Sequence, residues 1–312
     1  MQCPEVYTGN RLVKQRKKVQ NQGIDTKGCL YAQYYTSPSG VMVSLTMALE
    51  RQVAANRVVL WSDPVSLPEL ASSLTRNVIK VSVLPVTTMQ ALRLLRSSEP
   101  KETRNLRKLG ALNFASATTR GGGWLGTALT QEECITRNST LYHSLSLPLT
   151  SAYYTRERNK GDPAYFLYND TAIVSPHVVF FKDEFSCAAL EPHDCFEAVI
   201  VTCPAVMARN YFKEASADGA KTRQVHEEVV RETMRVRIRR VLAQFHEERC
   251  DAVVLGAFGC GAFGNNAEMV AGLFKEELQS REGWAFGEVL FAVAYDDTKF
   301  HIFERVMKTS FA

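Results

Sequence analysis

The chain has 312 residues, 46% of them hydrophobic, which is enough for one large α/β domain or two small ones with a sizeable buried core. Its 37 basic and 33 acidic residues leave a formal net charge of +4, which gives no electrostatic footprint for duplex nucleic acid. The eight cysteines include no CxxC pair, so their spacing argues against a structural zinc site and for buried free thiols in a reducing compartment.

The N-terminal stretch has the pattern of neither a secretory signal nor a membrane anchor. It lacks the apolar core of a secretory signal, and no run of 18 apolar residues occurs along the chain. We therefore expect no membrane span and an intracellular protein, cytoplasmic, nuclear or both. The basic residues at 15–18 fit a solvated helix face, with a weak nuclear signal as the alternative.

Near Thr75 the sequence pattern changes, and segments typical of strands begin to alternate with segments typical of helices. The elements expected here, in order, are a helix at 41–55, a strand at 58–62, a strand at 78–84, a helix at 89–95 and a strand at 109–115. We accordingly expect an N-terminal accessory region, residues 1–74, packed on a main domain, residues 75–312.

The rest of the chain continues the alternation of strands and helices. The expected elements are a helix at 130–145, a surface excursion at 146–195 with a strand at 171–181, a strand at 197–205, a helix at 221–250, a strand from 251, a helix at about 266–279, a strand at 288–295 and a helix at 300–308. The arginines of the helix at 221–250 are expected on a solvated face. This order predicts a three-layer α/β/α fold with a mixed, mostly parallel sheet.

Two glycine-rich loops follow strands of the expected sheet, at 121–123 and at 259–264. Ligands of such sheets bind beyond the carboxyl ends of the strands, where bare backbone N–H groups can cradle an anion. The second loop, GCGAFG, also matches the GxGxxG dinucleotide fingerprint. It lies too near the C-terminus to leave room for a second mononucleotide-binding half. The loop therefore predicts a phosphate cradle, with a purely structural turn as the alternative.

An amide and two carboxylates, Gln131, Glu132 and Glu133, follow the first loop at the expected start of a helix. Successive helix positions point about 100° apart, so one acid can hold sugar hydroxyls while the other reaches the reacting bond. A carboxylic acid held against apolar walls would have a raised pKa and could protonate a leaving oxygen. The alternative is that both acids merely favour a helix N-terminus, with Thr130 as its cap.

The stretch GGGWLGTALTQEE resembles the signature of microbial-type poly(ADP-ribose) glycohydrolases, which is three glycines, a short spacer and Gln-Glu-Glu. Three other stretches resemble further segments of that family: TRNVIKVSVLPVTTMQAL (75–92), LNFASA (112–117) and GAFGCGAFGN (256–265). The resemblance implies a macrodomain-like fold with an N-terminal helical extension and a cleft for ADP-ribose. It further implies hydrolysis of the ribose–ribose O-glycosidic bond of poly(ADP-ribose), with release of ADP-ribose.

The same resemblance implies which molecules the protein acts on and which partners it is not expected to have. Poly(ADP-ribose) or ADP-ribosylated proteins would be the substrates, in the setting of the DNA damage response. Neither a cofactor nor a metal is implied, and neither a membrane nor a specific nucleic-acid sequence is expected as a partner.

The family's functional residues map onto positions of this sequence. By this resemblance Glu133 would be the general acid that protonates the departing 2′-oxygen, and its carboxylate would then activate the attacking water. Glu132 would hold the ribose of the leaving unit, Asn113 would bind the distal ribose and Phe263 would orient it. The other residues implied in substrate binding are Ser116, Gly121, Gly122, Gly123, Gln131, Gly259, Cys260, Gly261, Ala262 and Asn265.

Two residues beside the glycines, Arg120 and Trp124, depart from the family pattern. They are expected to narrow or reshape the mouth of the cleft, which leaves the substrate open between polymer and a single protein-linked ADP-ribose. A non-catalytic ADP-ribose reader is the alternative from another class, although binding alone does not need the second carboxylate. A nicotinamide-dinucleotide oxidoreductase is a third alternative, supported by GCGAFG alone.

Overall fold

The computed structural model describes residues 9–64, 67–68, 79–98, 107–155, 162–218, 222–281 and 283–308. Seven of its strands form one sheet in the order β3-β6-β7-β5-β8-β9-β4. Their bounds are β3 Arg57–Val59, β4 Lys80–Leu84, β5 Leu109–Phe114, β6 Ala172–Phe180, β7 Phe196–Cys203, β8 Ala252–Gly256 and β9 Glu288–Ala292. The strands from β7 to β4 are parallel, and β6 is antiparallel to both of its neighbours. The expected mixed, mostly parallel sheet is confirmed.

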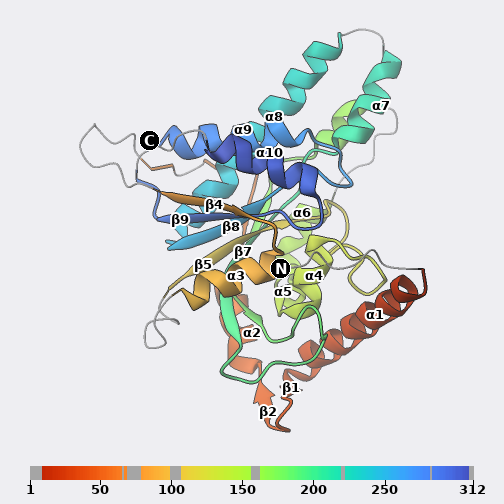
Figure 1. Cartoon of the computed structure of the whole chain (residues 1–312), viewed down its shortest axis with the longest axis vertical. Coiled ribbons are helices and arrows are strands. Elements are labelled where there is room, and N and C mark those ends of the chain that lie inside the picture. Colours follow the sequence, from red (N-terminus) through yellow and green to blue (C-terminus); the bar gives the residue numbers. More distant parts are fainter. Residues whose placement is uncertain are drawn as a thin grey trace.

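Helices cover both faces of this sheet (Figure 1). One face carries α8 (Arg223–Glu247), α9 (Ala267–Gln279) and α10 (Asp297–Lys308), and the other carries α3 (Thr88–Ser97), α4 (Gln131–Asn138) and α5 (Leu141–Leu145). The central strands need this double cover, because β5, β7 and β8 are apolar and buried along nearly their whole length. The three layers expected from the sequence are therefore present.

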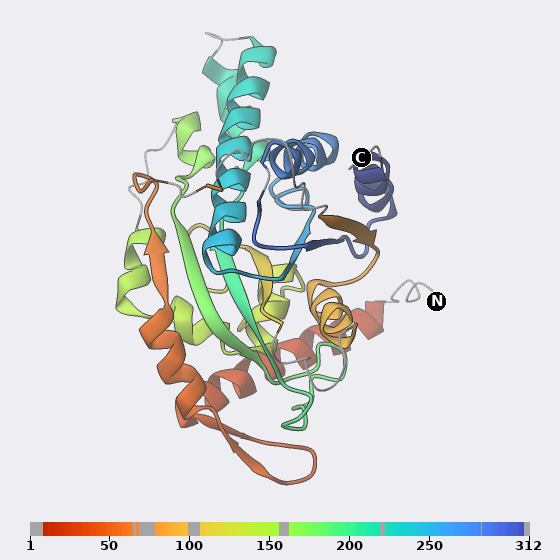
Figure 2. The same ribbon diagram turned by 90° about the vertical axis from the view of Figure 1, so that its left-hand side faces the viewer.

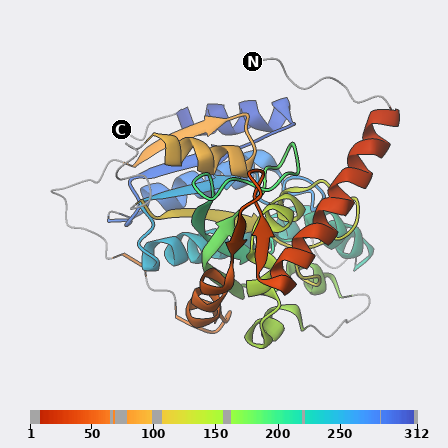
Figure 3. The same cartoon turned by 90° about the horizontal axis from the view of Figure 1, so that it is seen from below.

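The N-terminal part of the chain forms a helical extension, as expected. The long helix α1 (Gly9–Ala32) lies along the side of the molecule (Figure 3) and is tied to α4 by two short hydrogen bonds. Gln22 Nε2 donates to Asn138 Oδ1 at 2.6 Å, and Thr26 Oγ1 donates to the carbonyl oxygen of Arg137 at 2.6 Å. Residues 16–18 lie on its exposed face.

The helix expected at 41–55 is shorter in the structure. Only α2 (Thr46–Ala55) is helical, because the residues before it form β2 (Met42–Ser44), which pairs with β1 (Tyr34–Thr36). Strand β3 then joins the edge of the main sheet beside β6. The boundary between residues 74 and 75 lies outside the described residues, so the division of the chain there remains a prediction.

Of the two long helices expected, one is interrupted by tertiary contacts and the other is present as a single helix, α8. The helix at 130–145 is split into α4 and α5, because Ser139 pairs with Phe180 and the Thr140 amide donates to Val179. Helix α8 extends beyond the sheet together with α7 (Ala208–Asp218), as Figure 2 shows. The prediction that the α8 arginines form a solvated face is wrong for Arg237 and Arg240, which are buried.

The surface excursion contains short helical turns before β6. They are η1 (Pro148–Thr150), α6 (Ser151–Tyr154) and η2 (Pro163–Leu167). Seven cysteines fall in the described part of the chain, and all of them are free thiols. In that same part, no helix combines the length and the apolar character that a membrane crossing requires.

Candidate active site

The two glycine-rich loops leave neighbouring strands at the same edge of the sheet. Strands β5 and β8 are parallel and paired, so the loops that follow them start side by side. The rings of Phe114, at the end of β5, and Phe258, just after β8, are 5.7 Å apart. Gly256 ends β8 against Phe114, where a Cβ would lie 3.0 Å from the ring. The expected meeting of both loops at the carboxyl edge is confirmed.

Glu132 is a buried carboxyl group on the first turn of α4, only 3% exposed. Its Oε2 accepts a hydrogen bond from the Ser116 amide at 2.7 Å, and Asn113 Nδ2 lies 3.5 Å from its Oε1. Burial raises the pKa of Glu132 to about 8; the Ser116 hydrogen bond opposes the rise, and the neighbouring Glu133 carboxylate adds to it. Glu132 therefore holds a proton at neutral pH.

Glu133 is also buried, at 6% exposure, and it faces the glycine loop. Its Oε1 accepts a hydrogen bond from the Gly123 amide at 2.8 Å, and its Oε2 accepts one from the Thr130 hydroxyl. Thr130 is the N-cap residue of α4 by position, but its side chain makes no hydrogen bond to the helix backbone. The hydroxyl instead fixes the carboxylate, so the expected capping role is replaced by contact with Glu133.

The position of Gly122 explains why bare backbone precedes the acids. This residue has φ +59°, a conformation that side chains strongly disfavour. A Cβ at this point would lie 2.4 Å from Glu133 Oε1 and 2.9 Å from Glu132 Oε2. Because both oxygens lie so near one point, they are within about 5 Å of each other. The glycine thus makes room for two carboxylates against the main chain.

The raised pKa of Glu132 predicts a pH-dependent stability difference for Glu132→Gln. The pKa of this carboxyl is near 8 in the folded state and about 4.5 in the unfolded state. Its stabilisation of the folded state is therefore complete below about pH 4.5 and is lost as the pH rises towards 8. At pH 9 the variant should therefore melt higher than the wild type, and by pH 5 this advantage should shrink. Asn113 can accommodate the new amide by a side-chain flip, because its Oδ1 has no partner among the described residues.

Thermal unfolding at pH 5, 7 and 9 would check this. The matched control is Glu227→Gln, an exposed carboxylate on α8 whose pairing with Arg223 is local. A melting difference between Glu132→Gln and wild type that stays constant from pH 5 to pH 9 would contradict the assignment of the buried proton.

Three other predicted site residues hold the acids in place. The Gln131 amide is engaged with β5: its Oε1 accepts from the Phe114 amide at 2.9 Å, and its Nε2 donates to the Leu112 carbonyl at 2.7 Å. Asn113 is fully buried and donates to Thr202 Oγ1 at 3.2 Å as well as towards Glu132. Ser116 Oγ accepts from the amides of residues 118 and 119. Their roles in substrate binding remain predictions.

The second loop presents its backbone outward. The amides of Gly261, Ala262 and Phe263 make no hydrogen bond within the described part of the chain, and the first two residues are exposed. Gly259 has φ +70°, and a Cβ there would lie 2.4 Å from Ala205. Three consecutive unpaired N–H groups at a strand end form a concavity suited to an anion.

Cys260 and Asn265 are buried residues that stabilise the shape of this loop. Burial raises the pKa of the Cys260 thiol to about 12, so the thiol stays protonated and unreactive. Asn265 Nδ2 donates to the carbonyls of Val206 at 2.7 Å and Gly259 at 3.0 Å, which fixes the turn. Both side chains are buried, and the loop can offer its backbone to a ligand while they hold its shape.

Arg137 is a buried residue that the sequence analysis did not single out. Its guanidinium is 1% exposed and donates to four carbonyl oxygens of the glycine loop, those of Gly123, Trp124, Gly126 and Ala128, at 2.6–3.3 Å. It lies one helical turn after Glu133, so it anchors the loop whose Gly123 amide binds that carboxylate. The sequence feature that points to Arg137 is its place four positions after Glu133, on the same face of the helix.

Replacing Arg137 with Met should destabilise the fold by roughly 3–5 kcal/mol, because the carbonyls of Trp124, Gly126 and Ala128 would lose their donor. Arg137→Lys should recover only part of this, since an ammonium cannot span all four acceptors. Chemical denaturation measures both effects. Arg223→Met is the control, an exposed arginine on α8 where the change should stay within about 0.5 kcal/mol. Equal stability of Arg137→Met and the control would refute the anchoring role.

Arg237 is a second buried arginine near the site. It is 0% exposed and donates to Asp170 Oδ1 and to the carbonyls of Leu167 and Pro204, at 2.9–3.0 Å. It therefore fixes the end of η2 to the carboxyl end of β7. Arg237 lies between Met234 and Ile238, on the apolar stripe of α8. This position is the sequence feature that indicates burial of Arg237.

Arg120 and Trp124, the two residues expected to reshape the mouth of the cleft, both make contacts with α5, and Arg120 also contacts α6. Trp124 is 2% exposed and packs on Tyr142, with ring centroids 4.5 Å apart. Arg120 Nε donates to the Leu145 carbonyl at 2.9 Å, and its guanidinium lies 4.7 Å from the Tyr154 ring centroid. Trp124 is therefore a core residue behind the glycine loop.

Comparison with known proteins agrees with this geometry. The family model "Microbial-type PARG, catalytic domain" matches residues 24–183. A search of the curated proteins finds no match. Among solved structures, the poly(ADP-ribose) glycohydrolase (PARG) of Thermomonospora curvata is 28% identical, with 93% of this chain and 99% of that chain covered and a TM-score of 0.75.

Two further structures contain ligands. The Thermomonospora curvata enzyme bound to the inhibitor ADP-HPD has a TM-score of 0.73 to this chain at 28% identity, over 93% of this chain and 99% of that one. The PARG of Deinococcus radiodurans in complex with ADP-ribose is 30% identical, with 84% of this chain and 97% of that chain covered and a TM-score of 0.64. The chain therefore belongs to the family of microbial-type PARG catalytic domains.

Proposed function

We propose that the chain hydrolyses the ribose–ribose O-glycosidic bond of poly(ADP-ribose) and releases ADP-ribose. The observation that carries this proposal is the pair of buried carboxyl groups, Glu132 and Glu133, against the backbone of Gly122. A reader of ADP-ribose would need the anion-binding loops but would gain nothing from burying two acids, which is costly. Relatives whose structures contain ADP-ribose or ADP-HPD support the same ligand class.

The proposed mechanism divides the work between the two acids. Glu133 acts in its protonated form: its O–H proton passes to the departing 2′-oxygen, the C–O bond breaks, Glu133 becomes a carboxylate and the anomeric carbon becomes an oxocarbenium-like cation. The carboxylate of Glu133 then takes a proton from water as the water attacks that carbon, which restores the acid. Gly123 and Thr130 hold this carboxylate in one orientation by their hydrogen bonds.

Glu132 and the second loop position the substrate in this proposal. Glu132, protonated at neutral pH, can donate a hydrogen bond to a ribose hydroxyl without adding a negative charge beside the pyrophosphate. The outward amides of Gly261, Ala262 and Phe263 would bind the pyrophosphate oxygens. Asn113 lies behind Glu132 and would fix its orientation.

The cellular setting and the division of the chain are also proposals. We propose that the protein acts inside the cell, in the cytoplasm, the nucleus or both. Residues 1–74 would form an accessory region packed on the catalytic domain, residues 75–312. The hydrogen bonds from α1 to α4 support this packing, because they join the first segment to the helix that carries both acids.

A hydrolysis assay tests the proposed function directly. Purified protein is incubated with poly(ADP-ribose) on an automodified polymerase and, in parallel, with a mono-ADP-ribosylated protein, and the released nucleotide is identified by chromatography. We expect free ADP-ribose from the polymer. Polymer left intact while ADP-ribose still binds would instead indicate a reader, and release from the mono-modified protein alone would indicate a mono-ADP-ribosyl hydrolase.

A further inference from the structure

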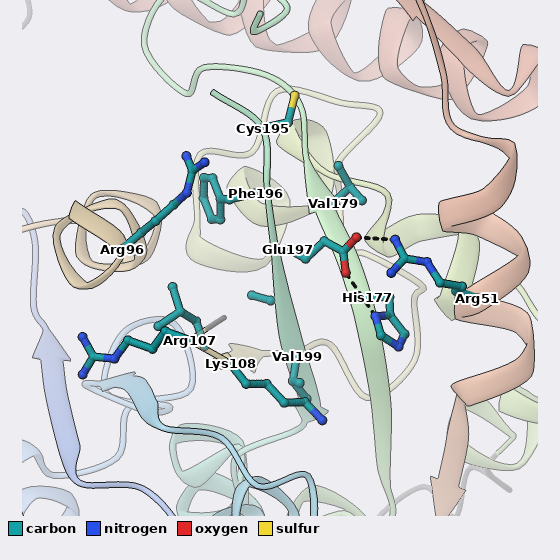
Figure 4. A pocket seen from close by; sticks show the side chains of 12 residues that line it. Arg51, Arg96, Arg107, Lys108, His177, Val179, Cys195, Phe196, Glu197 and Val199 are labelled. Carbon is teal, nitrogen blue, oxygen red and sulfur yellow. Dashed lines mark hydrogen bonds and ion pairs between the residues drawn. The ribbon is translucent and has the colours of Figure 1, made fainter. Parts of the chain in front are cut away.

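A cavity of about 620 Å³ opens at the end of the sheet opposite the two acids (Figure 4). Its walls include Leu109 and Phe196, the first residues of β5 and β7, whereas the carboxylates lie beyond the last residue of β5. Six residues at about 3.3 Å each place roughly 16–20 Å between the two ends. The cavity, here called the basic pocket, is thus separate from the candidate active site, and its volume lies in the range of small-molecule sites.

Four cationic side chains line the basic pocket. Arg51, Arg96, Arg107 and Lys108 contribute four cations, against the single carboxylate of Glu197. The cations lie on α2, on α3 and just before β5, and Glu197 lies on β7, so segments far apart in the sequence converge here.

The carboxylates at the pocket and its rim are each shared between two basic groups. Glu197 binds Arg51 and His177, Glu248 binds Arg57 and Lys108, and Glu288 binds Lys80 and Arg107. Glu288 is shared between two cations, Lys80 and Arg107, and so compensates only part of the charge of each. The arginine and lysine heads are held in place by these contacts while an attraction for anions remains.

The floor of the pocket is apolar and closely packed. Phe196 is 6% exposed and stacks on Phe180, with ring centroids 4.8 Å apart and an interplanar angle of 7°. The Arg96 guanidinium lies 5.8 Å from the Phe196 ring centroid and donates to the carbonyls of residues 193 and 194. Figure 4 shows this guanidinium beside the ring, at the side of the pocket opposite Arg51.

His177 reaches the pocket through a distorted stretch of β6. Its φ is +59°, and it lies where the pairing register with β7 shifts, between Ser175 and Val178. Buried Gln52 donates to its carbonyl oxygen at 2.8 Å, which holds this backbone conformation. A bulge of this kind redirects a side chain. Here the ring turns towards Glu197, with 3.1 Å between Nδ1 and Oε2 (Figure 4).

We propose that the basic pocket binds a phosphate-bearing anion of nucleotide size, at a site distinct from the catalytic cleft. A carboxylate could be satisfied by one arginine, but cations on several walls suit a group with many charged oxygens, such as a pyrophosphate. The apolar floor beside Phe196 suits the less polar remainder of a nucleotide. That pyrophosphate could belong to a free nucleotide or to one unit of a longer polymer. The inference does not rest on the proposed function.

Inorganic pyrophosphate is the probe for a direct test. Calorimetry follows its binding to the full chain saturated with ADP-ribose, which occupies the cleft. The pocket variant is Arg51→Glu with Lys108→Glu, two partly exposed side chains whose reversal leaves the core intact. The control is Arg305→Glu with Lys308→Glu on α10, the same charge change on another surface. We expect at least about tenfold weaker binding in the pocket variant and a change within about twofold in the control.

Each outcome decides the inference. Equal weakening in both double variants would overturn it, and so would a wild type that binds neither pyrophosphate nor a second equivalent of ADP-ribose. A second equivalent of ADP-ribose that the pocket variant loses would support a free nucleotide as the ligand. A loss seen only with poly(ADP-ribose) would support a polymer segment. If ADP-ribose does not bind the cleft, the proposed function fails, while the two variants compared with pyrophosphate alone still test the pocket.

Discussion

Replacing Glu133 with Gln is expected to lower kcat for poly(ADP-ribose) hydrolysis by at least about 10³-fold, because the amide cannot donate or recover the proton that the departing oxygen needs. The substitution preserves shape: the Gln Oε1 can still accept from the Gly123 amide, and the Thr130 hydroxyl can turn to accept from the new Nε2. ADP-ribose affinity should therefore stay within about tenfold of the wild type. Release of ADP-ribose and calorimetric binding measure the two quantities.

Glu132→Gln is the informative partner for this experiment. It changes the adjacent acid, which is buried to a similar extent, and it should impair kcat less than Glu133→Gln because it leaves the proposed proton donor in place. The pH profiles add a second test: if protonated Glu132 helps to bind the ribose, kcat/KM of the wild type should fall as the pH rises through about 8. If Glu132→Gln abolished turnover and Glu133→Gln did not, the two roles would be exchanged.

The alternation of elements along the chain was enough to predict the layered fold. Strands such as β5 and β8 are short apolar runs that end in glycine-rich loops, and neither needs distant residues to be recognised. Because parallel neighbours end at one edge, the sequence pattern also predicts that both loops lie together. The acids at the start of α4 were found by the same local signals.

The parts that escaped prediction depend on contacts between distant segments. The residues before α2 form β2 because they pair with β1, and α4 ends where Ser139 pairs with Phe180. Helix α1 has no strong apolar stripe in its sequence; its fixed position comes from Gln22 and Thr26, which bond to α4. Local pattern contains none of this information.

The buried arginines show the same limit at the level of single residues. Arginine is a residue type that is mostly exposed, yet Arg137 is buried against the glycine loop because the carbonyls of Trp124, Gly126 and Ala128 take it as their donor. A backbone that folds back on itself without forming a strand or helix leaves such carbonyls unpaired. The sequence pattern assigns the loop glycines to the ligand and does not show which residue donates to the loop's own carbonyls.

Gly122→Ala is expected to displace the carboxyl groups of Glu132 and Glu133. The added Cβ would lie 2.4 Å from Glu133 Oε1 and 2.9 Å from Glu132 Oε2, distances at which an atom must move, and φ +59° strains any side chain. Both acids would be displaced from their places beside Gly123 and Ser116. We expect kcat to fall by about 10²–10³-fold, comparable to a misplacement of the reacting groups by about 1 Å.

Gly272→Ala is the matched control, because a Cβ on that α9 glycine meets nothing within 4 Å. It should leave kcat unchanged and should not lower the melting temperature, since alanine favours a helix interior over glycine. Folding of Gly122→Ala is checked by circular dichroism before its kinetics are measured. Full activity in a folded Gly122→Ala protein would show that the carboxylates can leave these positions without cost, and a mechanism that depends on their fixed geometry would then have to be abandoned.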